Sequence, residues 1–324
     1  MNRLPIFKFI PRYAEVVWGG RSLQTVLNKN LPSDVPVGES WEICDLPDYQ
    51  SVVAEGSLKG ESLEKVIRDN GDLLLGKTDL LHGRFPLLFK YIDAKQKLSV
   101  QVHPDDDACK KIAGGARPKT EAWYIIECAE DAVLYVGLKK GVTRKDFERA
   151  LSDGSVEFLL HKKPVKPGDY IFLPSGTLHA IGSDILLAEV QQSSNTTYRA
   201  FDWNRTGLDG KPRELHIEQA LESIHFDEFE EPVITPPDSG RPGVKCDYFS
   251  METVVLNDND SQDFEFEIPV AIMGVNGKGT LTVTCEDEIT ALKCGETVLI
   301  PAHLSGNVKV EAKDNITLVL TQIY

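Results

Sequence analysis

The chain has 324 residues, and its 50 acidic residues exceed the 35 basic ones by 15. That length is ample for a large hydrophobic core, and the negative charge disfavours nucleic acid as a partner, because a phosphate backbone is bound through clustered lysine and arginine. No segment approaches the ~20 consecutive apolar residues of a membrane span, so we expect a cytoplasmic protein with no membrane partner. The six cysteines lack CxxC spacing, which predicts reduced thiols rather than a zinc knuckle or a redox pair.

Most of the chain reads as short strands separated by clusters of Gly, Pro, Asn and Asp, the pattern of a β-sandwich or barrel. Three segments have helical spacing instead: 60–76, with Ser62 as the expected cap, 143–151 and 214–224. Between 225 and 247, acidic runs and prolines oppose regular structure and indicate a connection between two halves. We therefore predict a mainly β fold with a first domain at 1–235, which holds the functional site, and a second β domain at 236–324.

A weak internal repeat supports this division. The segment 166–181 resembles 293–308 when their Lys-x-Gly-acid turns are superposed, and each reads as a turn, a strand and a turn that begins with proline. In this alignment His179 falls opposite Gly306, and His303 falls opposite Gly176. If both halves are the same kind of barrel, only the first keeps a metal ligand. The alternative is that any two β-hairpins look this similar, because the match covers a single strand with its turns.

Three strand openings in the first half carry residues that bind metals. In 97–106 apolar and polar residues alternate, so Gln101 and His103 point to the same face of a strand. Glu121 opens another predicted strand, and His179 opens a third. Two imidazoles and a carboxylate, supplemented by a neutral amide oxygen, suit Zn²⁺, Fe²⁺ or Mn²⁺ and leave positions for water or substrate.

Each of these residues also has a plain structural interpretation. His103 would then be a single hydrogen-bonded histidine at a strand end, and His179 a turn histidine without a role. Glu121 would be an exposed charge at a strand edge, paired with Lys119. For the remaining histidines, which have no matching partners, we expect no function: His82, His161, His216, His225 and His303.

Two basic residues accompany the predicted site. Arg199 lies in the polar segment 191–203, where an arginine fork can bind a phosphate or stabilise negative charge that develops during a reaction. The structural alternative is an ion pair between Arg199 and Asp202 that holds a loop. Lys119 precedes Glu121 by two residues and would lie on the same strand face, which places a cation near the metal ligands.

The segments that carry these residues resemble the type I mannose-6-phosphate isomerases (phosphomannose isomerases) in their short bacterial form. The matching segments cover nearly the whole chain in the family's order: VWGG (17–20), GESWEI (38–43), KYIDAKQKLSVQVHPDD (90–106), PKTEAWYI (118–125), LPSGTLHAI (173–181) and NTTYRAFDW (195–203). The resemblance implies two cupin-type (jelly-roll) β-barrels with a few short helices. It also implies one zinc ion per chain, bound by Gln101, His103, Glu121 and His179, and an active-site role for Arg199.

The reaction implied by this resemblance interconverts mannose 6-phosphate and fructose 6-phosphate through a cis-enediol intermediate, whose charge a divalent ion would stabilise. Arg199 and Lys119 would add fixed positive charge, whereas the base stays open between a metal-bound water and Asp202. The partner would be a small phosphosugar, and the chain a monomer or a weak homodimer. Two alternatives are a non-haem iron cupin oxygenase and a non-catalytic sugar-binding or storage cupin that keeps the metal for stability.

Overall fold

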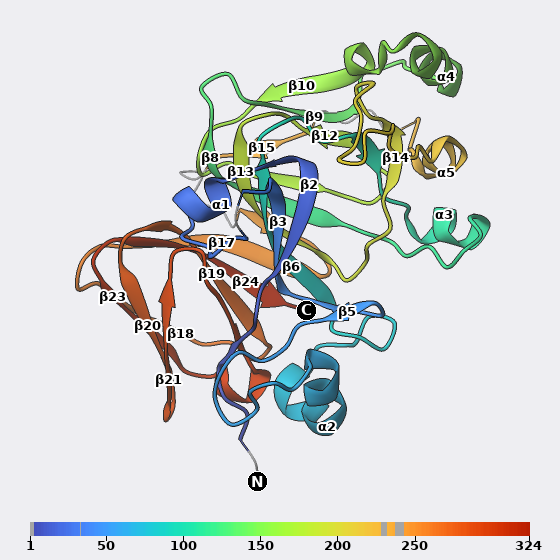
Figure 1. Cartoon of the computed structure of the whole chain (residues 1–324). Helices are drawn as coiled ribbons and strands as arrows, with labels where there is room; N and C mark the ends of the chain where they lie inside the picture. The colour runs from blue at the N-terminus through green and yellow to red at the C-terminus, as the bar shows by residue number, and fades with distance from the viewer. Residues whose placement is uncertain (1–2, 33, 228–231, 237–242) are drawn as a thin grey trace.

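The computed structural model describes residues 3–32, 34–227, 232–236 and 243–324, and it consists mainly of antiparallel strands with a few short helices (Figure 1). This confirms the predicted fold class. Among the described residues, the strands of each half form a pair of sheets, and no sheet closes into a continuous ring.

The first half is built from two sheets and one small hairpin. The seven-stranded sheet has the order β15 (Ile234–Thr235), β11 (Tyr170–Leu173), β8 (Glu121–Cys128), β13 (Ile185–Gln192), β6 (Leu87–Ala94), β3 (Val37–Ile43) and β2 (Arg12–Gly20). The five-stranded sheet has the order β10 (Leu160–Pro164), β9 (Val133–Leu138), β12 (His179–Ile181), β7 (Val100–Val102) and β14 (Tyr198–Phe201). The hairpin joins β4 (Asp45–Leu46) to β5 (Tyr49–Gln50).

The second half repeats this two-sheet arrangement, drawn in orange and red in Figure 1. Its six-stranded sheet has the order β1 (Phe7–Lys8), β22 (Thr297–Ile300), β19 (Val270–Gly277), β24 (Ile316–Ile323), β17 (Phe249–Leu256) and β16 (Val244–Lys245). Its four-stranded sheet has the order β18 (Ser261–Phe264), β23 (Val308–Lys313), β20 (Thr280–Cys285) and β21 (Glu288–Lys293). The N-terminal strand β1 thus pairs with a strand of the second half, with Phe7 opposite Leu299.

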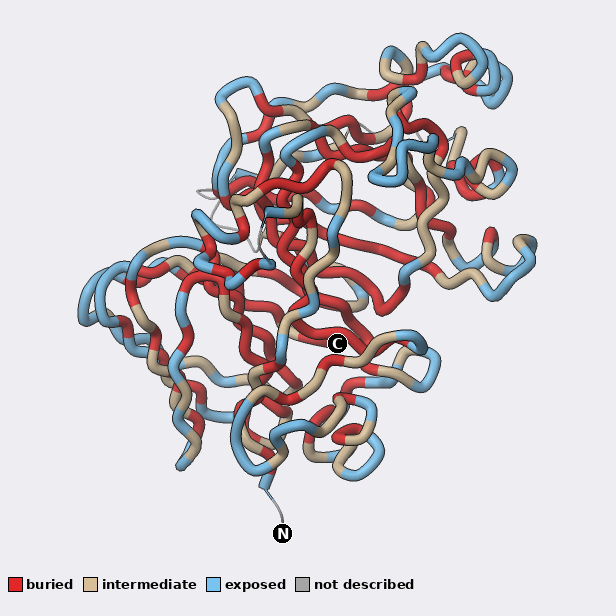
Figure 2. The backbone as a smooth tube through the Cα atoms, viewed as in Figure 1, coloured by how far each residue is buried: buried red, intermediate tan, exposed pale blue. Residues whose placement is uncertain are grey.

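Three hydrophobic clusters lie between the layers and hold them together. One fills the first half between its two sheets and includes Trp123 and Leu134. Another fills the second half and includes Ile272 and Val283. The largest joins the seven-stranded sheet of the first half to the six-stranded sheet of the second. Figure 2 shows the buried backbone running along these central strands, whereas the helices turn exposed faces outward.

The three predicted helices are present, and the first begins at its expected cap, Ser62. Ser62 accepts a hydrogen bond from the backbone N–H of Lys65 and begins α2 (Leu63–Leu75), and Thr143 forms a capping box with Asp146 at the start of α4 (Arg144–Asp153). The third is α5 (Ile217–Ser223). The elements that the sequence did not reveal are α1 (Ser22–Thr25), α3 (Asp106–Lys111) and the 3₁₀ turns η1 (Val156–Leu159) and η2 (Ala302–Leu304).

The internal repeat is visible as two equivalent turns. The acid of each turn accepts a hydrogen bond from the backbone N–H of its lysine, Lys166 to Asp169 at 2.9 Å in the first half and Lys293 to Glu296 at 2.9 Å in the second. A strand and a proline-led turn follow in both. The division of the chain at 235/236 stays a prediction, because residues 228–231 and 237–242 of the predicted connection lie outside the described residues.

We expect Gly295→Ala to destabilise the protein by roughly 2 kcal/mol more than Gly56→Ala. Both glycines have a positive φ, +84° and +82°, so either substitution strains the backbone. At Gly295, however, the new Cβ would also lie 1.9 Å from the Leu27 carbonyl oxygen, whereas nothing lies within 4 Å of Gly56. Urea unfolding of both variants measures the difference. Equal losses of stability in the two variants would show that the backbone at Leu27 shifts to accommodate the new Cβ without lowering the free energy of unfolding further.

Candidate metal centre

The predicted ligands come together between the two sheets of the first half. His179 is the first residue of β12 and lies directly opposite Gln101 of β7, and His103 follows the end of the same strand. Glu121 is the first residue of β8, in the facing seven-stranded sheet. Glu121 and His179 therefore open their strands as expected, whereas His103 lies just after the end of its strand, and the cluster spans the interior from one sheet to the other.

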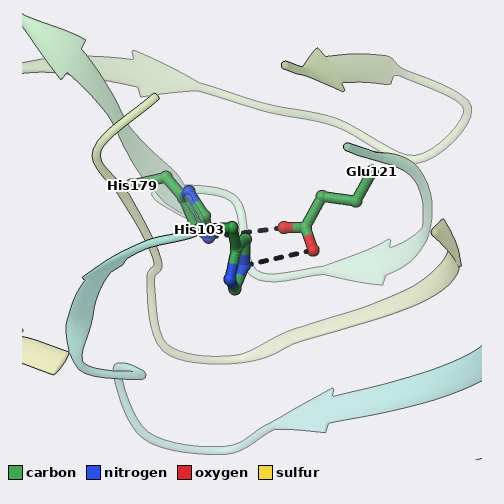
Figure 3. A group of neighbouring side chains, drawn as sticks. All are labelled: His103, Glu121 and His179. Carbon is green, nitrogen blue, oxygen red and sulfur yellow. Dashed lines mark ion pairs between the residues drawn. The ribbon is translucent and has the colours of Figure 1, made fainter. Parts of the chain in front are cut away.

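The side chains of His103, Glu121 and His179 point toward one another (Figure 3). Nε2 of His103 lies 3.4 Å from Oε2 of Glu121, and Nε2 of His179 lies 3.3 Å from Oε1. One ligand atom from each residue falls within 4.8 Å of the others, and all three residues are buried. Burial rules out the interpretation of Glu121 as an exposed charge.

Backbone carbonyls fix which ring nitrogen of each histidine carries the proton. Nδ1 of His103 lies 2.9 Å from the carbonyl oxygen of Thr196, and Nδ1 of His179 lies 2.9 Å from that of Thr177. A carbonyl only accepts, so in both neutral rings Nδ1 is the donor and Nε2 keeps a free lone pair directed at Glu121. This orientation of ring nitrogens is typical of metal-binding histidines.

The charges at this cluster favour a bound cation. Neither carboxylate oxygen of Glu121 has a hydrogen-bond donor of good geometry among the described residues, although the Lys119 ammonium lies 2.6 Å from Oε2. Burial alone would raise the pKa of Glu121, but Lys119 and His103 outweigh burial and hold the pKa well below its usual value. Two neutral imidazoles and an ionised carboxylate match the donors that a divalent transition metal prefers.

Gln101 and Arg199 extend the cluster along one row of the five-stranded sheet. Gln101 lies between His179 on β12 and Arg199 on β14, and its amide nitrogen is 3.4 Å from Nε2 of His179. Nη1 of Arg199 donates to the carbonyl of Glu214 at 2.7 Å, while its buried Nε has no hydrogen-bond partner in the described part of the chain. His216, for which no function was expected, accepts a hydrogen bond from the Arg199 backbone.

The expected alternative of an Arg199–Asp202 pair is not observed in the described residues, because Asp202 binds two other arginines. Its Oδ1 accepts from Nη2 of Arg205 at 2.8 Å, and its Oδ2 accepts from Nε of Arg213 at 2.7 Å. Burial opposes ionisation, but Arg213 and Arg205 outweigh it and lower the pKa of Asp202. Asp202 therefore positions arginines and is poorly suited to accept a proton, the role considered for it above.

A cavity of about 330 Å³ adjoins the cluster and brings to it charged residues that the sequence did not reveal as candidates. Gln101, Lys119 and Arg199 line it together with three charged residues of the facing sheet, Glu39, Lys90 and Glu189. Glu189 lies opposite Lys90 on one side and Trp123 on the other. The available signal was a buried charge within each of two mainly apolar strands, Lys90 in β6 and Glu189 in β13, although β6 also carries Asp93.

These three residues form a buried ion-pair network. The Lys90 ammonium lies 3.5 Å from Oε2 of Glu39 and 3.3 Å from Oε1 of Glu189, and the Trp123 indole N–H donates to Oε2 of Glu189 at 3.0 Å. Burial opposes the ammonium, but Glu39 and Glu189 outweigh it and raise the pKa of Lys90. Lys90 therefore stays protonated beside Oε1 of Glu189, an oxygen that has no hydrogen-bond donor of good geometry among the described residues.

We expect the chelated, metal-free protein to lose about 3 kcal/mol of unfolding free energy between pH 6.5 and pH 4 through His103 alone. Burial, with a smaller contribution from Lys119, lowers the pKa of His103 from 6.5 to about 4. Over this interval His103 is protonated in the unfolded chain but stays neutral in the folded one. The contribution of His103 to the free energy of unfolding is therefore complete above pH 6.5 and decreases as the pH falls. Urea unfolding at several pH values measures the slope. His103→Gln should flatten it, and an unchanged slope in that variant would contradict the assignment.

Comparisons with known proteins agree with this geometry. The family model described as "Phosphomannose isomerase type I, catalytic domain" matches residues 6–126. Mannose-6-phosphate isomerase ManA of Bacillus subtilis is 34% identical over 323 residues, which cover 96% of this chain and 97% of the relative. The described residues contain no helix that is both long and apolar enough to cross a bilayer.

Solved structures show the same architecture. The mannose 6-phosphate isomerase of Bacillus subtilis superposes with a TM-score of 0.86 at 30% identity and covers 99% of this chain and 100% of its own. A more distant structure is a mannose 6-phosphate isomerase bound with zinc and yttrium, which superposes with a TM-score of 0.69 at 17% identity. The match covers 99% of this chain and 100% of that one, and at this identity it shows the fold alone. By its family model, its relatives and its fold, the chain belongs to the type I mannose-6-phosphate isomerases, the phosphomannose isomerase family.

Proposed function

We propose that this isomerase interconverts mannose 6-phosphate and fructose 6-phosphate with one zinc ion held by Gln101, His103, Glu121 and His179. The observation that supports this most is the convergence of two unprotonated imidazole nitrogens on an ionised, buried carboxylate. The donor set fits zinc, and a distant structure of the same fold is one of an isomerase bound with zinc. When bound, the metal would polarise the sugar carbonyl and stabilise negative charge on the sugar oxygens.

Lys119 and Arg199 are proposed to act on the substrate from either side of the metal ligands. The Lys119 ammonium lies 2.6 Å from Glu121 and 3.3 Å from Nε2 of His103. A divalent ion bound by the same two residues would repel this ammonium into the cavity that it lines, where it would donate to a sugar oxygen. Arg199 has a free guanidinium N–H in the same cavity and would stabilise the charge that develops on the cis-enediol intermediate.

The phosphate group is proposed to bind at the arginine end of the cavity. Arg199 and Arg213 line this end, together with the small polar side chains of Ser99, Asn195 and Thr197. Asp202 holds the Arg213 guanidinium through both of its oxygens and thereby fixes the plane of the fork. A guanidinium held in this way loses little conformational freedom when it binds a phosphate.

Glu189 is proposed as the carboxylate that moves the proton between C1 and C2. The reaction needs a base beside the sugar, and the metal ligand Glu121 is not free to accept a proton. Glu189 lies diagonally across the strand pair from Glu121, because Gln191 of β13 is the direct partner of Glu121. Trp123 donates to Oε2 of Glu189, so Oε1, which lies 3.3 Å from the Lys90 ammonium, is the atom proposed to accept the proton.

The two alternatives from the sequence receive less support. An iron oxygenase would use the same metal ligands, but it has no need for the cations Lys90, Lys119, Arg199 and Arg213 around one small cavity. A storage protein would need neither the free oxygen of Glu189 nor a cavity beside the metal ligands. A cytoplasmic location and a monomeric or weakly dimeric state stay predictions.

We expect His103→Ala and His179→Ala to lose bound zinc and at least ~100-fold of isomerase activity together, because each removes one of the two imidazole ligands. Atomic emission measures the metal, and a coupled assay of fructose 6-phosphate formation measures the activity. The exposed turn residue His82, changed to Asn, provides a control that keeps both. Full activity after complete removal of metal by a chelator would refute the proposal.

We expect Glu189→Gln to lower kcat by a factor of about 10²–10⁴ while KM and zinc content stay close to the wild-type values. The amide keeps the shape of the side chain and its contact with Trp123 but cannot accept the proton. Glu39→Gln is the matched control, because Glu39 also lines the cavity and pairs with Lys90. Similar losses in the two variants would mean that Glu189 only balances the charge of Lys90.

A further inference from the structure

A second and larger cavity lies on the opposite face of the strands that carry the catalytic network. Glu39 and Lys90 face the catalytic cavity, whereas Glu42 of β3 lines a cavity of about 770 Å³ between the two halves of the protein. The two cavities share no lining residue. From the first half the second cavity takes residues of β1, β2 and β3, and from the second half it takes the turns around Lys278 and Lys293.

The deep wall of this cavity carries a buried ion pair. The Lys29 ammonium donates to Oε1 of Glu42 at 2.6 Å, and the two side chains are 7% and 5% exposed. Ser40 also donates to Oε1, and the Lys29 ammonium lies over the Tyr91 ring at 5.0 Å from its centre. Burying both charges costs free energy that a well-packed apolar pair would avoid, so folding alone does not account for this pair.

The same wall has polar groups left over. The Lys29 ammonium has three N–H groups. Among the described residues, the Glu42 carboxylate is the one acceptor to which it donates. Thr297 is 6% exposed, and its hydroxyl has no hydrogen-bond partner of good geometry in the described structure. The nearby Tyr91 hydroxyl donates its hydrogen bond to the backbone, where it lies within reach of the carbonyl oxygens of Gly274 and Glu296. Ammonium, carboxylate and hydroxyl groups side by side can both donate to and accept from the hydroxyl groups of a carbohydrate.

The rim of the cavity is positive. Lys8 pairs with Glu296 at 2.8 Å, but Lys278 and Lys293 are exposed and make no ion pair within the described residues. In all, four lysines and three glutamates line the cavity of a chain whose net charge is −15. An excess of cations here runs against the charge of the protein and favours an anionic group.

We propose that this cavity is a second ligand site, which binds a phosphorylated sugar or sugar alcohol, with its hydroxyl groups on Lys29, Glu42 and Thr297 and its phosphate at Lys278 and Lys293. The aromatic rings of Phe9 and Tyr13 line the same cavity and provide apolar surface for a carbon skeleton. The site is independent of the metal centre and belongs to both halves of the chain, so a bound ligand bridges them.

Calorimetric titration with sorbitol 6-phosphate tests the proposal, since this sugar alcohol has no carbonyl group to isomerise. We expect two equivalents to bind to the zinc-loaded wild-type protein and one to Lys278→Ser/Lys293→Ser, which should keep the wild-type kcat and KM. The control Lys140→Ser/Lys145→Ser removes the same charge from exposed lysines of the first half that do not line the cavity, and it should bind two. If the isomerase assignment failed, the wild type would bind one equivalent and the rim variant none.

Equal stoichiometry in the wild type and the rim variant would overturn the proposal. The second variant, Lys29→Met/Glu42→Leu, replaces the buried pair by apolar side chains of similar size and should also lose one equivalent. Inorganic phosphate and unphosphorylated sorbitol separate the two parts of the ligand. Each should bind the cavity at least tenfold more weakly than sorbitol 6-phosphate, and inorganic phosphate of equal affinity would show an anion site without sugar recognition.

Discussion

The buried carboxylate of Glu121 is the constraint on which the first half of the protein depends. An ionised group placed between two sheets and away from water is stable only where cations or donors surround it. Lys119 lies beside it, and the imidazoles of His103 and His179 turn their lone pairs toward it from the opposite sheet. These nitrogens do not donate to the carboxylate, so the arrangement is complete only with a positive charge between them. The charges that stabilise this buried carboxylate thus also make the position a candidate site for a metal ion.

The strands β3 and β6 separate two polar environments because side chains alternate along a strand. Lys90 and Ile92 face the cavity beside the candidate metal centre, and Tyr91 between them faces the second half and donates to its backbone. On β3 the same alternation places Glu39 on one face and Glu42 on the other. A small shift of either strand would therefore move residues that line both cavities.

Much of the metal centre could be predicted from the sequence, because local rules control it. Alternation placed Gln101 beside His103, and Ser62 marked the start of one helix. Glu39, Lys90 and Glu189 escaped prediction, because their meeting depends on the register between strands that are far apart in the chain. The ion pair between Asp202 and Arg213 was missed for a similar reason, because a loop separates the two residues in the chain. No local pattern encodes such pairings.

The position of β1 in the sheet of the second half has a consequence for biosynthesis. The N-terminal strand leaves the ribosome first, yet its neighbour β22 is among the last strands to be made. Until β22 has been made, the apolar residues Leu4, Ile6 and Phe7 lack neighbours against which they pack in the folded protein. Such a long-range closure slows folding and ties the last folding step to completion of the chain. A translation product interrupted before β22 would leave these apolar residues exposed, and exposed apolar surface of this kind promotes aggregation.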